Sequence, residues 1–246
     1  MPPSALSLPL VYINLDEDTQ RRSSFEAACA AAGVQVERLA ATRWSRLPAD
    51  EQAQLYSPSL NARRYFRPML PGEMGCYASH IAAWQRLLAS SSAAMVVLED
   101  DVKPQADFAA VVNAVAALPA GWDMVKLIGR AQERPATRQP LVGGFDLVSY
   151  RRVPSLTAGY IVSRCGAEKL LATRVPFGRP IDEDLRHWWE SDLVMRGVLP
   201  AAIADADTGS TSSIGVRQRQ TRLALRFRKF LFKCRYTLRN SVARER

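Results

Sequence analysis

Short apolar runs and amphipathic stretches alternate at the start of the chain. Val11–Leu15 is an apolar run that ends in polar residues, which predicts a buried parallel strand. Arg21–Ala32 follows with apolar side chains at helical spacing, and Gly33 ends that predicted helix. Val34–Leu39 predicts a second strand. A strand, a helix and a strand in this order favour an α/β fold over a sandwich or a helix bundle.

The same alternation continues through the rest of the chain. Residues 45–70 contain three prolines and predict helical turns joined by loop, and Gln132–Gly144 contains two prolines and a Gly-Gly pair that predict a mobile loop. The remaining predicted elements are strands at Ala93–Leu98, Met124–Ile128 and Leu156–Val162, and helices at Glu73–Ala89, Phe108–Leu118, Gly166–Thr173 and Glu183–Met195.

The positive charge of the chain is concentrated at its C-terminal end. The 246 residues have a net charge of +9, and the segment Arg217–Arg246 holds eleven Lys or Arg residues and one acid. The preceding residues are therefore close to neutral. We expect one folded domain over residues 1–216 and a basic tail over residues 217–246. A nearly neutral body argues against a nucleic-acid-binding domain, because such a domain carries its basic patch on the folded surface.

The composition is that of a globular protein. Hydrophobic residues make up 48% and charged residues 23%, which excludes intrinsic disorder for the body. No apolar run approaches the roughly 20 residues of a membrane-spanning helix. The four cysteines lack CxxC spacing, so we expect reduced thiols rather than a zinc site or a disulfide framework. Met1–Pro9 lacks the pattern of a secretory signal, and we expect a cytoplasmic protein.

Three acidic residues directly follow the predicted strand at Ala93–Leu98. Glu99, Asp100 and Asp101 would lie at the carboxyl edge of the sheet, where open α/β sheets bind ligands. On an extended chain Glu99 and Asp101 share one face while Asp100 points elsewhere, and two carboxylates on one face suit a hard divalent cation. A solvated acidic turn explains the triplet equally well.

Polar residues also follow the first predicted strand. Asn14, Leu15 and Asp16 end that strand, and Arg21 and Arg22 open the next helix. Backbone amides at a helix start, together with arginine, suit a phosphate group. The chain contains neither GxGxxG nor GxxxxGK[ST], so this pattern supports no dinucleotide or P-loop site. Simple solvation of the helix start is the alternative.

Two further clusters carry groups able to transfer protons. His80 is one of two histidines, and its simpler interpretation is a core histidine bonded to a backbone carbonyl. Ser79 beside it faces the wrong way for a nucleophile–base pair. Asp182, Glu183 and Asp184 precede a predicted helix, where they either cap the helix or supply a carboxylate general base. Helix capping is the simpler interpretation of these three acids.

Six motifs in a fixed order carry a family resemblance. They are Val11–Asp16 with Arg21-Arg22, Gly72–His80, Val97–Asp101, Ala158–Ser163, the helix at Ala167–Leu171, and Pro180-Ile181-Asp182. Over roughly residues 10–215 the chain resembles glycosyltransferase family 25, which includes lipooligosaccharide galactosyltransferases of Gram-negative bacteria. It departs from the family after Ser213-Ile214, where the basic tail replaces a longer continuation.

The resemblance implies a fold, a reaction and a set of site residues. The implied fold is a GT-A-like, Rossmann-type mixed sheet flanked by helices. The implied reaction is inverting transfer of a sugar, most often galactose, from a UDP-sugar to a lipopolysaccharide or lipooligosaccharide core acceptor. Glu99 and Asp101 would hold Mn²⁺ or Mg²⁺, and Asp182, or else Asp184, would be the general base. The implied donor-binding residues are Asn14, Leu15, Arg22, Ser79, His80, Asp100 and Lys126.

The tail itself has the pattern of an amphipathic helix. Leu223–Leu238 carries apolar residues at helical spacing, interleaved with Arg and Lys. A cationic amphipathic helix is typical of a membrane-surface anchor, and a glycolipid acceptor would lie at that surface. We therefore expect a peripheral protein on the inner face of the inner membrane, bound through Arg217–Arg246. The alternative is a helix packed on the body with a solvated basic face.

Two other classes of function remain open on the sequence. One is a non-catalytic protein that keeps the fold and binds a glycolipid or a nucleotide without turnover. The other is a nucleic-acid-associated protein that uses the tail. Slow hydrolysis of the donor separates an enzyme from the first alternative, and deletion of residues 217–246 tests the second.

Overall fold

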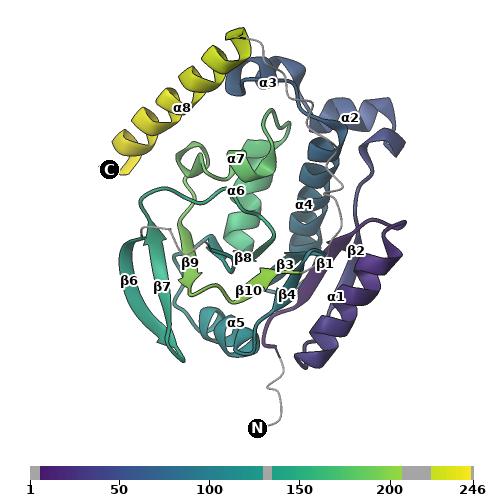
Figure 1. The fold of residues 1–246 in the computed structure, drawn as a ribbon, viewed down its shortest axis with the longest axis vertical. Helices are drawn as coiled ribbons and strands as arrows, with labels where there is room; N and C mark the ends of the chain where they lie inside the picture. The colour runs from purple at the N-terminus through teal and green to yellow at the C-terminus, as the bar shows by residue number, and fades with distance from the viewer. Residues whose placement is uncertain (1–5, 130–134, 207–222, 245–246) are drawn as a thin grey trace.

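The chain is built around one large mixed sheet (Figure 1). A computed structural model describes residues 6–129, 135–206 and 223–244. The large sheet has the strand order β2-β1-β3-β8-β5-β9-β7-β6, and β10 pairs with β4 in a second sheet. The strands are β1 (Leu10–Asn14), β2 (Glu37–Ala40), β3 (Ala94–Glu99), β4 (Val102–Pro104), β5 (Met124–Lys126), β6 (Pro135–Val142), β7 (Phe145–Tyr150), β8 (Gly159–Ser163), β9 (Met195–Leu199) and β10 (Ile203–Asp205).

Helices cover both faces of this sheet and confirm the predicted α/β fold. Side chains of α4, α6 and α7 share one core with one face, and side chains of α1 and α5 share a second core with the other. The helical segments are α1 (Thr19–Ala31), η1 (Trp44–Arg46), α2 (Ala49–Leu55), α3 (Pro58–Arg64), α4 (Pro71–Ala89), α5 (Phe108–Ala116), α6 (Arg164–Arg174), α7 (Ile181–Asp184), η2 (Trp188–Glu190) and α8 (Leu223–Arg244).

The first strand, β1, could be predicted from the sequence because it is buried on both faces. Val11 and Ile13 of β1 lie in one core, whereas Leu10 and Tyr12 lie in the other. A strand that is buried on both faces needs apolar residues at every position, and it therefore reads as a continuous run. β1 pairs in parallel with both β2 and β3, so the carboxyl ends of these three strands meet at one edge.

The loop prediction over Gln132–Gly144 is wrong for the part that the structure describes. β6 pairs antiparallel with β7 across a turn at Gly143 and Gly144, where φ is 54° and 83°. Glycine adopts such positive angles without strain. β6 is the last strand of the sheet, and a strand at an edge tolerates the prolines that suggested a loop.

The helix predicted over Glu183–Met195 is also wrong. α7 ends at Asp184, the short turn η2 follows, and β9 begins at Met195. Asp192 between them has a φ of 49°, which a continuous helix does not allow. The buried His187, whose Nδ1 lies 2.9 Å from the Glu183 carbonyl oxygen, fixes the irregular path.

The C-terminal helix is present and lies against the body. α8 extends the predicted Leu223–Leu238 helix, and it packs through Tyr236 and Asn240, which are 4% and 3% exposed. The expected domain boundary at residues 216 and 217 falls within 207–222, outside the described residues. Among the helices that the structure describes, none combines the length and the hydropathy of a membrane span.

Candidate active site

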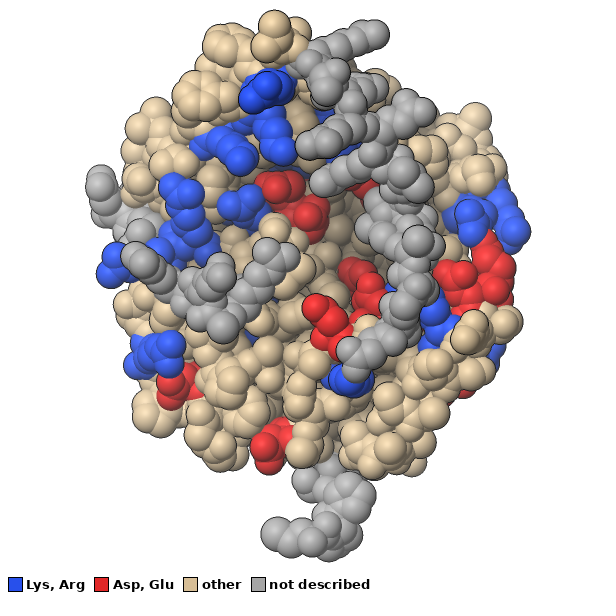
Figure 2. Space-filling view, in the orientation of Figure 1, with Lys and Arg blue, Asp and Glu red and all other residues tan. Residues whose placement is uncertain are grey.

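A cavity of about 190 Å³ lies at the carboxyl edge of β1, β2 and β3. Its walls are the ends of β1 and β3, residues 41–45 after β2, Asp18 and Arg21 at the start of α1, and the first turns of α4. Figure 2 shows acidic side chains around the hollow at the centre of this face of the molecule. The predicted site residues Asn14, Leu15, Ser79, His80, Glu99, Asp100 and Asp101 all line this cavity.

Close packing of α4 against residues 41–45 shapes one wall. A side-chain carbon at Gly75 would lie 2.5 Å from the Thr42 carbonyl oxygen, so only glycine allows this approach. The Ser79 hydroxyl accepts a hydrogen bond from the Thr42 amide and donates one to the Gly75 carbonyl, each at 2.8 Å. Ser79 therefore lines the cavity and also connects residues 41–45 to α4 through these two hydrogen bonds.

The acidic triplet is split by the end of its strand. β3 ends at Glu99, and Asp100 and Asp101 lie in the turn before β4. The Arg21 Nη2 atom lies 2.8 Å from Asp100 Oδ1 and 3.3 Å from Asp101 Oδ2. The expected alternation, with Asp100 pointing away from its neighbours, is therefore wrong, because the chain turns where the expectation assumed an extended strand. Glu99 instead faces His80.

Asn14 holds the acidic turn in place from the end of β1. It is 1% exposed, and its Nδ2 donates to Asp100 Oδ2 at 2.6 Å. Its Oδ1 accepts from Arg38 Nε at 3.0 Å. The Asn14 amide thus orients the Asp100 carboxylate. Its Nδ2 group, which was expected to bind the donor, is bonded to Asp100 instead.

Arg22 does not line the cavity, contrary to the expectation. Its Nε lies 3.1 Å from Glu26 Oε1 on the outer side of α1. Neighbouring residues on a helix point about 100° apart, so only one of the two arginines can face the acidic turn. The structure gives that place to Arg21.

The charges of the acidic turn are partly uncompensated. Burial raises the pKa of Asp101, the nearby Glu99 charge raises it further, and it reaches about 6. Burial also raises the pKa of Glu99, but the hydrogen bond and charge of His80 outweigh burial, and the net pKa lies below the ordinary value. Asp101 Oδ1 is buried and has no hydrogen-bond partner within the described part of the chain.

His80 connects this turn to the core. It is 1% exposed, its Nδ1 lies 2.9 Å from the Tyr160 hydroxyl, and its Nε2 lies 3.4 Å from Glu99 Oε1. The Trp84 Nε1 donates to the same Tyr160 hydroxyl at 3.0 Å. The structure confirms that His80 is a buried histidine, but the expected backbone-carbonyl partner is wrong, because both ring nitrogens contact side chains.

Asp182 and Lys126 are not among the residues that line the cavity. Burial and the adjacent Glu183 raise the pKa of Asp182 to about 6, and the Lys126 charge opposes this rise. Burial and the Glu99 charge raise the pKa of Cys76, a half-buried residue of the cavity wall, and the Asp182 charge adds to this rise. The Lys126 ammonium donates to the Pro154 carbonyl oxygen at 2.7 Å and is 1% exposed, which places it below the surface that a donor phosphate would reach.

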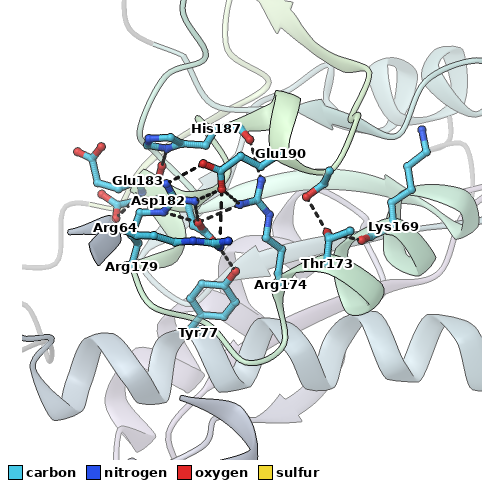
Figure 3. Close-up of polar contacts among 12 residues, drawn as sticks. Arg64, Tyr77, Lys169, Thr173, Arg174, Arg179, Asp182, Glu183, His187 and Glu190 are labelled. Carbon is cyan, nitrogen blue, oxygen red and sulfur yellow. Dashed lines mark hydrogen bonds and ion pairs between the residues drawn. The ribbon is translucent and has the colours of Figure 1, made fainter. Parts of the chain in front are cut away.

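Asp184 belongs to a buried ion-pair network, not to an open site. It is 2% exposed and accepts hydrogen bonds from Arg179 Nε at 2.6 Å, Arg174 Nη1 at 3.1 Å and the Tyr77 hydroxyl at 2.6 Å. Figure 3 shows both arginines converging between Tyr77 and Glu190. The two guanidinium groups outweigh burial and hold the pKa of Asp184 below its ordinary value. These contacts occupy both carboxylate oxygens of Asp184, so the structure places it in a buried network and not in the wall of the cavity.

Comparison with known proteins shows the family to which this chain belongs. A family model described as glycosyltransferase family 25 (LPS biosynthesis protein) matches residues 9–185, which include the whole wall of the cavity. The chain belongs to glycosyltransferase family 25. The matched residues of this family 25 chain end before α8.

The alignments with relatives in the family cover only part of the length of each relative. A protein of Drosophila pseudoobscura pseudoobscura named "Glycosyltransferase 25 family member" is 31% identical over 185 residues, which are 72% of this chain and 29% of the insect protein. A human protein named "Inactive glycosyltransferase 25 family member 3" is 31% identical over 157 residues, which are 56% of this chain and 26% of the human protein. The chain therefore spans less than a third of each relative, and membership in family 25 does not by itself establish catalysis.

One solved structure aligns with nearly the whole chain. It is described as a glycosyltransferase involved in the glycosylation of the major capsid of PBCV-1, and the alignment covers 92% of this chain and 98% of that one. The identity is 9% and the TM-score is 0.33, so the likeness carries no argument about this site.

Proposed function

We propose that this family 25 chain is an inverting glycosyltransferase. It would move a sugar, with galactose as the first candidate, from a UDP-sugar to a core sugar of lipopolysaccharide or lipooligosaccharide. The observation that carries the proposal is the cavity at the parallel-strand edge, where Glu99 and Asp101 lie opposite the first turns of α4. The description of the matching family model as an LPS biosynthesis protein supports the acceptor class.

The start of α4 is suited to the diphosphate of the donor. Pro71, Gly72 and Gly75 of its first turns line the cavity, and α4 is 19 residues long. The positive end of a helix dipole and its free amides favour phosphate oxygens. Gly72 has no side chain to cover the backbone of the first turn, whereas the space beside Gly75 is taken by the Thr42 carbonyl.

Glu99 and Asp101 would hold the divalent cation of the reaction, Mn²⁺ or Mg²⁺. The buried, unpartnered Oδ1 of Asp101 beside a second carboxylate fits a cation with oxygen ligands. When bound, such an ion neutralises the charge that develops on the leaving nucleoside diphosphate. Arg21 and Asn14 keep the turn in place through their contacts with Asp100.

Asp182 would act as the general base that takes the proton of the acceptor hydroxyl. A carboxylate with a raised pKa is a better base near neutral pH than an ordinary one. At saturating Mn²⁺ we expect the transfer rate to rise with pH and level off above about 6, the pKa of Asp182. Below that value the rate falls about tenfold per pH unit, because only the ionised form accepts a proton. A pH–rate profile that stays flat between pH 5 and 7, about one unit either side of that pKa, would exclude Asp182 as the base.

Turnover of a donor distinguishes this proposal from a non-catalytic protein of the same fold. The non-catalytic protein is a second candidate because a human relative in the family is named inactive. The test incubates the full chain with Mn²⁺ and UDP-galactose, UDP-glucose or UDP-N-acetylglucosamine, and measures the release of UDP. Release from one donor, accelerated by lipooligosaccharide, supports the transferase. Binding of a donor without any release would favour the non-catalytic protein.

We also propose that α8 binds an anionic membrane surface, where the acceptor lies. Projected at about 100° per residue, its exposed apolar side chains form one stripe about 120° wide. The face that carries Phe232, Tyr236 and Asn240 lies opposite and contacts the body. The exposed stripe consists of Leu223, Phe227, Phe230, Leu231, Leu238 and Val242.

Basic residues flank this stripe on both sides. The same projection places Arg226 and Lys233 on one flank and Arg228, Arg235 and Arg239 on the other. Figure 2 shows Lys and Arg gathered in the upper left, the region where Figure 1 places α8. An apolar stripe between basic flanks is the arrangement of an interfacial helix. The alternative of a packed helix with a merely solvated face leaves the exposed apolar stripe unexplained.

Membrane binding should depend on the apolar stripe. The double variant Phe227→Ser/Leu231→Ser is expected to weaken binding to vesicles with anionic lipid by about 100-fold or more, because full burial of the two side chains together contributes roughly 3–6 kcal/mol. Co-sedimentation with vesicles measures this change. Equal binding of the variant and the unaltered chain would contradict the role of the stripe.

Membrane binding should also depend on the basic flanks. Arg235→Ser is expected to weaken binding to anionic vesicles by about fivefold, which corresponds to about 1 kcal/mol per basic residue. Arg86→Ser removes the same charge from α4, where Arg86 pairs with Glu37 on the surface of the body, and serves as the matched control. If both variants weaken binding equally, net charge alone explains it and α8 has no special role.

A further inference from the structure

Three different metal-ligating groups converge on the cavity wall beside the acidic turn. Cys76 and His80 lie four residues apart on α4 and therefore share a face of that helix. Glu99 approaches them from the end of β3. One ligand atom of each residue lies within 4.8 Å of the others, and all three residues line the cavity.

The spacing between His80 and Glu99 fits a pair of metal ligands. The His80 Nε2 and Glu99 Oε1 atoms are 3.4 Å apart. A charge-assisted hydrogen bond is shorter, about 2.7–2.9 Å. Two ligands at tetrahedral angles around Zn²⁺, with bonds of about 2.0–2.2 Å, lie about 3.4 Å apart. The observed distance matches this second geometry.

Neighbouring side chains orient the two ligands. The His80 Nδ1 lies 2.9 Å from the Tyr160 hydroxyl oxygen, and the Thr157 hydroxyl donates to Glu99 Oε1 at 3.3 Å. In the tautomer that carries its proton on Nδ1, His80 can bind a cation through Nε2, which takes the place of its hydrogen bond to Glu99. A partner on the second ring nitrogen is the usual support of a histidine that ligates a metal.

We propose that Cys76, His80 and Glu99 form a site for a borderline divalent cation such as Zn²⁺. Sulfur, nitrogen and oxygen donors together suit Zn²⁺ or Co²⁺, whereas Mg²⁺ takes oxygen ligands. Three protein ligands leave the fourth tetrahedral position open to the cavity, where water or a phosphate oxygen fits. The site shares Glu99 with the proposed Glu99–Asp101 pair and differs from that pair in using Cys76 and His80. A titration without nucleotide sugar tests it separately from sugar transfer.

Cobalt provides a direct probe, because a thiolate bound to Co²⁺ gives a charge-transfer absorption in the near ultraviolet. We titrate the full chain with Co²⁺ in the absence of any nucleotide sugar. The unaltered chain should develop this absorption at one equivalent of Co²⁺ and lose it when Zn²⁺ is added. Asp101→Asn should keep the absorption, because Asp101 is not one of the three ligands.

Cysteine variants identify the thiol. Cys76→Ser should abolish the absorption and weaken Zn²⁺ binding by more than the roughly 10–100-fold that loss of an outer-shell partner costs. Cys165→Ser/Cys234→Ser removes the two exposed thiols and should leave the absorption unchanged. Absence of a thiolate absorption in the unaltered chain or in this double variant overturns the proposal, even if Cys76→Ser does not fold. Persistence of the absorption in folded Cys76→Ser overturns it as well.

Discussion

Replacing Asp101 by asparagine is expected to reduce sugar transfer by about 100-fold or more, because a cation that neutralises the leaving group is worth several kcal/mol. Asp101 carries the unpartnered oxygen of the acidic turn, and its pKa of about 6 leaves it ionised at neutral pH. The neutral amide removes a ligand charge while keeping the size of the side chain. Initial rates of UDP release at saturating donor measure the effect.

The Asp101→Asn variant should remain folded, which separates a loss of chemistry from a loss of structure. Asparagine removes a half-exposed charge whose Oδ1 atom is buried and incompletely paired, so the free energy of unfolding should not fall. Asp50→Asn is the matched control, because Asp50 lies exposed in the first turn of α2, outside the cavity walls. Full activity in Asp101→Asn would exclude Asp101 as a ligand of the reactive cation.

Asp184→Asn is expected to lower the free energy of unfolding by about 3–5 kcal/mol, the cost of breaking a buried ion pair. The variant removes the buried Asp184 carboxylate that Arg174 and Arg179 share, and leaves these two nearly inaccessible arginines with the more exposed Glu190. Urea unfolding at neutral pH measures the change. Asp182→Asn is the matched control: it should abolish transfer while changing the unfolding free energy by less than about 1 kcal/mol, because Asp182 forms no ion pair with the described residues and asparagine can still accept the Glu183 amide hydrogen bond.

The ion pairs of Asp184 also predict that the stability of the fold depends on pH. The pKa of Asp184 is lower in the folded chain than its ordinary value, so its contribution is complete above the ordinary value and is lost as the pH falls through the folded value. Part of the acid sensitivity of the unaltered chain should therefore disappear in Asp184→Asn. An unfolding free energy that is equal in both proteins at neutral pH would show that the network around Asp184 does not stabilise the fold.

The elements that could be predicted from the sequence are those with a large buried apolar surface. β1 and β3 are covered on both faces and read as apolar runs, and the helix of α4 has a wide apolar face. β6 is an exposed edge strand, and its polar residues and prolines carry no strand pattern. In the stretch from α7 to β9, Asp184 and Glu190 pair with the buried Arg174 and Arg179, which precede it, and a hydrophobicity pattern does not distinguish such paired acids from those of an exposed helix face.

The site was predictable only to the level of strand ends and motifs. Acids after β3 and the polar end of β1 do meet in one cavity, as parallel strands require. The choice of Arg21 over Arg22 depends on the rotation of α1, which the sequence does not define to within one residue. The partnership of His80 with Tyr160 joins residues 80 positions apart, and no local pattern signals it.

Calorimetric titration of the chain with UDP-sugars, with and without Mn²⁺, tests the central claim most directly. The proposed function predicts that one UDP-sugar binds only with Mn²⁺ present, and that Asp101→Asn loses this binding while Asp50→Asn keeps it. If none of the UDP-sugars binds to the folded chain, or if binding is independent of both Mn²⁺ and Asp101, the cavity is not the donor site of a metal-dependent transferase.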